Sequence, residues 1–93
     1  MNGAPMQRRV FVANPQGLHL RPSAAFVELA GRFQSEIKVT HNNTSVNGKS
    51  VWDLLLLAAE VGSELTLEAN GPDAPAALDA LSELISTAPP EEN

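Results

Sequence analysis

The sequence predicts an α/β (α+β) fold of the open-faced β-sandwich type, a four-stranded antiparallel sheet with three helices on one face. Some segments alternate apolar and polar residues, as half-buried strands do, and others repeat apolar residues at helical spacing. They follow one another as strand, helix, strand, strand, helix, strand, helix (βαββαβα). Because alternating strands leave one face of a sheet wet, we expect the helices to cover the other face. The whole chain, 1–93, is the size of a single small domain.

The first strand and the first helix lie on either side of a turn. Residues 7–13 contain the run Val10-Phe11-Val12, which favours a strand, and Asn14-Pro15-Gln16-Gly17 ends it. A helix is expected from Leu20 to about Arg32. The apolar residues that recur there at helical spacing are Phe26, Leu29, Ala30 and Phe33.

Two strands joined by a turn follow the first helix. Residues 35–40 place Ile37 and Val39 on one face, as a half-buried strand requires. Residues 41–43 predict a turn, where we expect His41 to be solvated. Residues 44–46 then predict a short returning strand.

The second helix is predicted over residues 50–59, with Gly62 closing it. Its apolar positions include Trp52, Leu55, Leu56 and Ala59. Three further apolar residues on its other faces are Val51, Leu54 and Leu57, so the helix carries more apolar surface than one buried stripe requires. We expect Leu55 to pack in the core, and Trp52 less so because it stands close to the start of the helix.

The last strand and helix complete the order. Residues 64–69 alternate and end at Gly71-Pro72, after which Asp73 is expected to cap a third helix. The inward stripe of that helix is Ala77, Leu78, Leu81, Leu84 and Ile85. The ends of the chain, 1–6 and 87–93, are expected to be flexible.

Composition excludes several classes of function. The formal net charge is −5, which argues against a nucleic-acid partner because such binding neutralises phosphates with lysine and arginine. The absence of cysteine excludes disulfides and thiolate metal sites, and we expect no metal and no cofactor. No apolar run is long enough for a signal peptide or for insertion into a membrane, which predicts a cytoplasmic protein.

The motif Gly17-Leu18-His19-Leu20-Arg21-Pro22 carries most of the functional information. It places an imidazole and a guanidinium two residues apart where a loop turns into a helix, and a helix N-terminus offers unpaired N–H groups to an anion. Arg21 adds donors suited to phosphate oxygens, and a neutral imidazole can act as a nucleophile. These features favour phosphoryl transfer through His19. A histidine at this place that merely caps the helix or is solvated is the alternative.

These residues resemble the HPr family, the phosphohistidine carrier proteins of the bacterial phosphoenolpyruvate-dependent phosphotransferase system. The stretch from Asn14 to Phe33 is similar to the family's active-site loop and first helix. Asn47-Gly48-Lys49-Ser50 is similar to its second signature, and the likeness runs from about Val10 to Ile85. The open-faced sandwich is the fold that we expect.

The resemblance implies that His19 accepts a phosphoryl group from enzyme I and passes it to an EIIA-type acceptor, for sugar uptake or for regulation. It assigns phosphate neutralisation to Arg21 and the helix start to Pro22. From the unpaired N–H groups of a helix N-terminus, we expect those of Leu20 and Arg21 to face the phosphoryl oxygens. The chain is then a carrier and not an enzyme, and we expect a monomer.

Ser50 has two compatible interpretations. Ser50-Val51-Trp52-Asp53 matches a capping box, so its hydroxyl is expected to accept the N–H of Asp53. The resemblance adds regulatory phosphorylation of Ser50 by a dedicated HPr kinase/phosphorylase. By the same analogy the start of this helix forms an apolar docking patch for partners. The docking residues that we expect are Lys49, Val51, Trp52 and Leu54.

Departures from the family pattern leave alternatives. Glu28 and Asp53 stand where basic residues are frequent in the family, which favours a differently charged enzyme I or the nitrogen-related branch of the system. In that branch the chain would be a regulatory module whose phosphorylation state controls partner proteins. A ferredoxin-like RNA binder lacks its basic surface and strand aromatics here, and a hydrolase lacks a second catalytic group near His19 in sequence.

Overall fold

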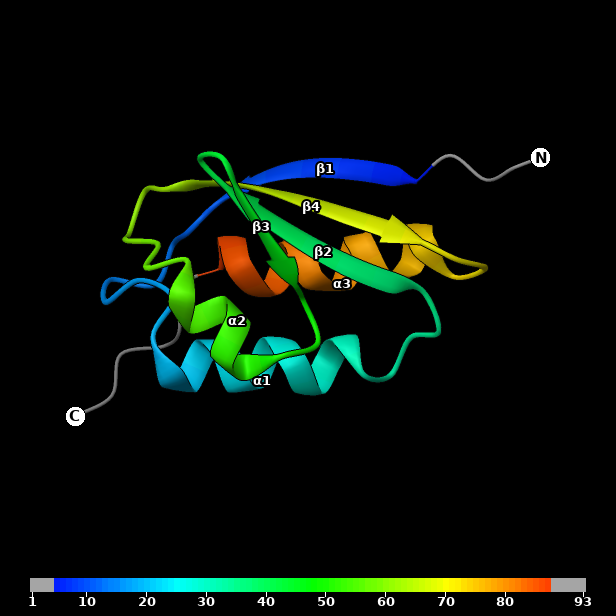
Figure 1. The fold of residues 1–93 in the computed structure, drawn as a ribbon, viewed down its shortest axis with the longest axis horizontal. Helices are drawn as coiled ribbons and strands as arrows, with labels where there is room; N and C mark the ends of the chain where they lie inside the picture. Colours follow the sequence, from blue (N-terminus) through cyan, green and yellow to red (C-terminus); the bar gives the residue numbers. More distant parts are fainter. Residues whose placement is uncertain (1–4, 88–93) are drawn as a thin grey trace.

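The structure is a computed structural model that describes residues 5–87. In chain order the elements are β1 (Met6–Phe11), α1 (Leu20–Ala30), β2 (Glu36–His41), β3 (Thr44–Asn47), α2 (Val51–Leu56), β4 (Glu64–Asn70) and α3 (Ala74–Ser86). The four strands form one antiparallel sheet in the order β1-β4-β2-β3. The predicted order of elements and the open-faced architecture are confirmed (Figure 1).

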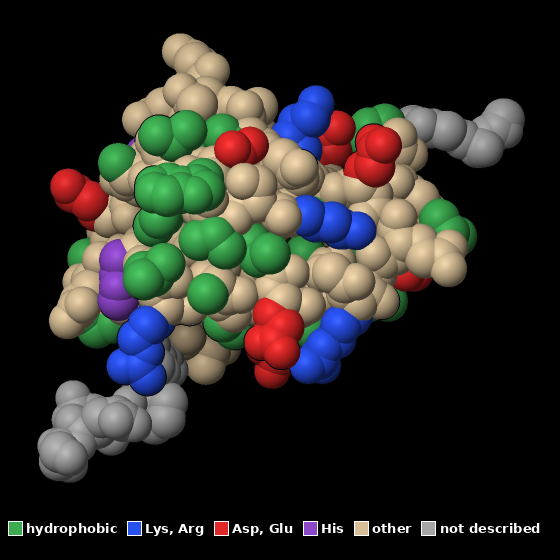
Figure 2. All heavy atoms as spheres, turned by 60° about the horizontal axis from the view of Figure 1, so that its bottom comes forward, with side chains coloured by type: hydrophobic (Ala, Val, Ile, Leu, Met, Phe, Trp, Pro, Cys, Tyr) green, Lys and Arg blue, Asp and Glu red, His purple; other side chains and the backbone are tan. Residues whose placement is uncertain are grey.

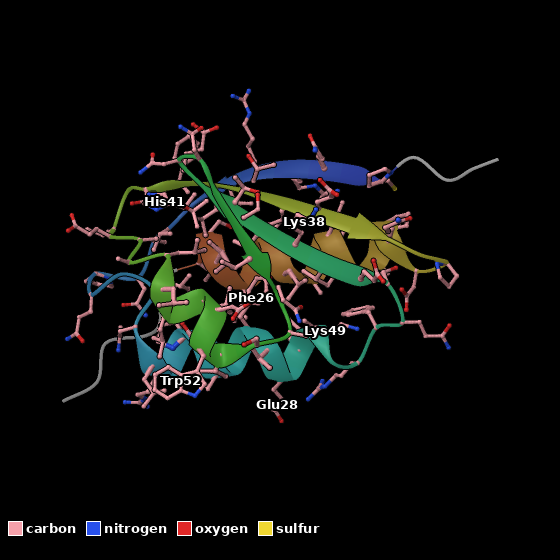
Figure 3. The ribbon with its side chains drawn as sticks, in the orientation of Figure 1. Phe26, Glu28, Lys38, His41, Lys49 and Trp52 are labelled. Carbon is pink, nitrogen blue, oxygen red and sulfur yellow. The ribbon has the colours of Figure 1, made fainter. Side chains whose placement is uncertain are left out.

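The helices form a layer on one side of the sheet (Figure 1). α3 packs against β1 and β4, α2 packs against β3, and α1 packs against both other helices. The registers place Leu65 opposite Val10 and Leu67 opposite Val39, so the apolar residues of the strands share the covered face. Phe26, 1% exposed, points from α1 into the space between helices and sheet (Figure 3). This core holds the start of α1 and the end of α3 at one end of the molecule.

The second helix differs from the prediction in length and in the face that it buries. α2 ends at Leu56, and Ala58 then takes the left-handed conformation (φ 52°). The buried residues are Leu54 and Leu57, which were expected on other faces, whereas Trp52 is 77% exposed. Leu55, expected in the core, is half-buried. A helix of six residues makes under two turns, so the position of its backbone on the sheet decides which apolar residues turn inward.

Other local predictions also need correction. Gly62 does not close α2 but lies in the turn before β4, with φ +87°. Asp73 is the residue before α3, yet its carboxylate accepts no hydrogen bond from that helix. The ends 1–6 and 87–93 were expected to be flexible. Met6 instead begins β1, and Thr87 directly follows α3. Residues 1–4 and 88–93 lie outside the described residues.

Candidate functional site

His19 is the residue that precedes the first turn of α1. Its backbone is extended (φ −89°, ψ −163°) and its side chain makes no capping hydrogen bond. The residue is half-buried. The capping alternative for this histidine is therefore not supported, since the imidazole is not used to satisfy the N–H groups of its own helix.

A tight loop fixes the backbone in front of His19. Asn14 organises it, because its carbonyl accepts the N–H of Gly17 (2.9 Å) and its side-chain oxygen accepts the N–H of Gln16 (2.9 Å). Gly17 adopts φ +77°, a conformation that favours glycine. Leu18 is buried, and its N–H donates to the carbonyl of Ala59 (2.9 Å). The loop is thus tied to the segment that follows α2.

The first turn of α1 has two backbone donors available for an anion. Pro22 has no N–H, and the N–H of Ser23 donates to the His19 carbonyl (3.0 Å). The buried Ser23 hydroxyl donates to the Leu18 carbonyl (3.2 Å), which holds the turn against the loop. The N–H groups of Leu20 and Arg21 have no acceptor within the helix. The exposed Arg21 side chain adds a positive charge at the same helix end.

His19 and Arg21 line one open depression between α1 and the end of α3. Most of the remaining lining residues belong to the loop before His19 and to the two helices, among them the apolar Pro22, Ala25 and Leu84. The depression is also lined by Glu83, which belongs to α3, and by Thr87, which directly follows it. Sequence analysis did not place Glu83 at the site, because nothing in the order of residues shows how α3 crosses α1.

An apolar patch lies on the helix layer beside this site. We define the apolar patch as Leu20, Trp52 and Leu56, which are 60%, 77% and 72% exposed. Leu20 belongs to α1, and Trp52 and Leu56 belong to α2. These two helices pack against each other. Figure 2 shows hydrophobic side chains gathered beside a histidine and a basic side chain. In Figure 3, Trp52 projects from α2 over the N-terminal half of α1.

The predicted docking residues divide into two groups. Trp52 is exposed and Val51 is half-buried, as docking requires. Leu54 is only 1% exposed, so its assignment to the docking patch is wrong and it is a core residue. Lys49 lies near the end of α1 (Figure 3), and its Nζ donates a hydrogen bond to the carbonyl of Phe33, a residue that follows this helix (2.7 Å). One N–H donor of Lys49 is therefore used within the protein.

Ser50 caps α2 as predicted. Its hydroxyl accepts the N–H of Asp53 at 3.2 Å. The reciprocal half of the capping box is not made, because the Asp53 carboxylate accepts the N–H of Asn47 (3.2 Å). Ser50 and the start of α2 are thereby joined to the end of β3.

His41 is not simply solvated. It is the last residue of β2, it is half-buried, and its Nδ1 lies 3.1 Å from the carbonyl of Leu57. The two histidines of the chain therefore have different surroundings, since only His19 stands at the start of a helix.

Neither a metal cluster nor a membrane span was found within the described part of the chain. No group of three or more His, Asp or Glu residues there is arranged to hold a metal ion. Between residues 5 and 87, every helix is too short or too polar to cross a lipid bilayer.

Comparisons with known proteins agree with this geometry. A family model described as "PTS HPr component phosphorylation site" matches residues 6–87. The phosphocarrier protein HPr of Cupriavidus necator is 44% identical over 81 residues, which cover 87% of this chain and 91% of that protein. HPr of Neisseria meningitidis serogroup A is 41% identical over 81 residues, with the same two shares.

Solved structures show the same fold. The crystal structure of HPr from Bacillus anthracis superposes with a TM-score of 0.85 at 39% identity, covering 88% of this chain and 98% of that one. A structure of Bacillus subtilis Crh, described as a domain-swapped dimer, gives a TM-score of 0.71 at 39% identity over 86% of this chain and 92% of that one. The monomeric state expected here therefore stays a prediction. Since the family model spans most of the sequence, the chain belongs to the HPr family of phosphocarrier proteins of the phosphotransferase system.

Proposed function

We propose that this chain accepts a phosphoryl group on His19 from enzyme I, originating in phosphoenolpyruvate, and passes it to an EIIA-type acceptor. The observation that carries the proposal is the place of His19 directly before α1, with an imidazole that makes no capping bond. The chain acts as the substrate of phosphotransferases and not as a catalyst of its own. No cofactor is needed, because phosphoryl transfer depends on positioning and on charge stabilisation.

The phosphorylated form is stabilised by the helix end and by Arg21. A phosphoryl group carries close to two negative charges, and a helix N-terminus favours an exposed anion by about 0.3–1 kcal/mol per charge. The N–H groups of Leu20 and Arg21 supply hydrogen bonds, and the Arg21 guanidinium supplies charge. This modest stabilisation suits a carrier that must release its cargo.

The apolar patch supplies the contact surface for both partners. Trp52 and Leu56 are large and exposed, and their helix α2 packs against α1, which His19 directly precedes. Exposed aromatic residues are frequent anchors of protein interfaces. Because His19 directly precedes Leu20 of this patch, a donor and an acceptor can use the same patch in turn.

The chain offers a matched pair of variants for a direct test, since it contains two histidines. We expect His41→Asn to take up label from phosphoenolpyruvate and enzyme I like the wild type, because an asparagine amide can still donate to the Leu57 carbonyl. We expect His19→Asn to take up none. The label on the wild type should be acid-labile and base-stable, as a phosphohistidine is. Label that persists in His19→Asn would contradict the proposal.

The acceptor is tested in a second step. Phosphorylated wild type is mixed with an EIIA-type protein of the sugar branch or with its nitrogen-related counterpart. We expect transfer to the sugar-type acceptor. Transfer to the nitrogen-type protein alone would instead support the regulatory module that the acidic residues Glu28 and Asp53 favour.

Regulatory phosphorylation of Ser50 stays a prediction. The capping bond from Asp53 N–H to the Ser50 oxygen shows that the hydroxyl has a structural role, which is compatible with regulation. Incubation with ATP and an HPr kinase/phosphorylase should give an acid-stable label on the wild type and none on Ser50→Ala.

A further inference from the structure

The depression beside His19 contains an acidic side chain that the proposed function does not use. Among the described residues that line it, only His19, Arg21 and Glu83 carry groups that ionise. Glu83 belongs to the last turn of α3 and is exposed. The ion pairs within residues 5–87 are Arg8–Asp79 and Arg9–Glu64, so Glu83 is not neutralised by such a contact.

The place of Glu83 follows from the packing of two helices. α1 and α3 pack against each other, and Ala25, Leu29, Ala80 and Leu84 all line the depression. Arg21 lines the depression from α1 and Glu83 lines it from α3. The carboxylate thus shares one solvent-filled hollow with the phosphoryl acceptor and with the guanidinium that is to neutralise the phosphate.

We infer that Glu83 sets the phosphoryl-transfer potential of this carrier, an inference that rests on His19 being the phosphoryl acceptor. In the unphosphorylated protein, the Arg21 guanidinium and the Glu83 carboxylate are the two opposite charges among the residues that line the depression. When the phosphoryl group arrives, a ring nitrogen of His19 supplies the electron pair for the new P–N bond. The bond from phosphorus to the donor breaks, and its electron pair stays on the donor.

The transfer brings close to two negative charges into the depression. The Glu83 carboxylate repels these charges and also competes for Arg21, so it raises the free energy of the phosphorylated form relative to the unphosphorylated form. Phosphohistidine in this chain is therefore a stronger donor than it would be without Glu83. Because the depression is open to water, the effect is moderate and depends on salt.

The experiment measures the equilibrium of phosphoryl exchange between enzyme I and this chain. We expect Glu83→Gln to increase the ratio of phosphorylated to unphosphorylated carrier by about two- to fivefold at low salt, and less at high salt. Glu83→Asp keeps the carboxylate and should stay close to the wild type. An equilibrium ratio does not report docking rates or a loss of partner contact, which alter only the time needed to reach it.

Glu28→Gln is the matched control. Glu28 is also an exposed glutamate, but it lies on the outer side of α1 (Figure 3) and does not line the depression. The same change of charge there should leave the ratio close to that of the wild type. If Glu83→Gln shifts the ratio no more than Glu28→Gln does, the inference about Glu83 is overturned while phosphorylation of His19 stands. Failure of the proposed function itself would appear separately, as absence of label on the wild type.

Discussion

The Asp73 carboxylate joins the start of α3 to Ser35, which lies 38 residues earlier in the chain. One of its oxygens accepts the Ser35 hydroxyl (2.6 Å) and N–H (3.0 Å), and the other accepts the N–H of Gln34 (2.8 Å). The segment between α1 and β2 is thereby fixed against the turn between β4 and α3. These hydrogen bonds favour the ionised carboxylate, the Ser35 hydroxyl most strongly and the Gln34 N–H next, and they lower the pKa of Asp73 below its ordinary value of 3.8.

The lowered pKa predicts how stability depends on pH. A carboxyl whose pKa is lower in the folded state contributes stability above its unfolded pKa and loses it as pH falls through the folded pKa. We expect Asp73→Asn to lower the free energy of unfolding at neutral pH. The difference from the wild type should shrink once pH drops below 3.8.

Urea unfolding between about pH 2 and about pH 7 checks this prediction. Ser35→Ala removes only the hydroxyl donor, so it should reduce the pH dependence in part and leave the contribution of the two N–H donors. A constant difference between wild type and Asp73→Asn across this range would contradict the assignment.

Replacing Gly17 should affect both stability and phosphorylation, because its backbone conformation and its close approach to Ala59 both disfavour a side chain. Its φ of +77° is unfavourable for other residues, and an added Cβ would lie 2.5 Å from the Ala59 carbonyl oxygen, the acceptor of the Leu18 N–H. We expect Gly17→Ala to cost about 1–3 kcal/mol of stability and to slow phosphorylation of His19, because the loop in front of it must shift. Urea unfolding and labelling with enzyme I measure the two effects.

Gly62→Ala separates strain from contact. Gly62 has a similar φ of +87°, but an added Cβ there meets nothing within 4 Å. It should therefore lose stability through conformation alone and keep the phosphorylation rate of the wild type. Equal losses of rate in the two variants would show that the contact with Ala59 does not position His19.

Ala58 predicts a gain of stability. It adopts φ 52° two residues after the end of α2 and is exposed. The left-handed conformation costs a non-glycine residue about 1–2 kcal/mol, which exceeds the extra chain entropy that a glycine loses on folding. Ala58→Gly should therefore raise the free energy of unfolding by about 0.5–1 kcal/mol. The control is Ala24→Gly within α1, which should lower it by a similar amount. A loss of stability in Ala58→Gly would contradict the argument.

Local patterns were sufficient to predict the order of elements and the place of His19. Strand alternation and helical spacing are set by residues that are neighbours in sequence, and so is the start of a helix at Leu20. The cap at Ser50 was predictable for the same reason, because it involves a residue only three positions away.

Contacts between distant residues were not predictable in this way. Asp73 was expected to cap its own helix, yet its carboxylate accepts hydrogen bonds from Gln34 and Ser35, which only the folded structure brings near. Glu83 reaches the site through the crossing of α3 and α1. In α2 both faces are apolar, so sequence could not decide whether Leu54 or Trp52 turned inward. Each of these features depends on how elements pack and not on the elements themselves.

The opposite faces of α2 predict opposite phenotypes for two neighbouring apolar residues. Trp52 is 77% exposed and belongs to the apolar patch, whereas Leu54 is 1% exposed and belongs to the core. We expect Trp52→Ala to change the free energy of unfolding by no more than about 0.5 kcal/mol while raising the KM of enzyme I for this chain about tenfold. Leu54→Ala should cost about 2–5 kcal/mol of stability. At a temperature where this variant is still folded, its KM should stay close to that of the wild type. Urea unfolding and steady-state phosphorylation measure both quantities. An unchanged KM in Trp52→Ala would show that the indole is not part of the docking surface. A Leu54→Ala variant that is stable but has a raised KM would show that Leu54 is part of it.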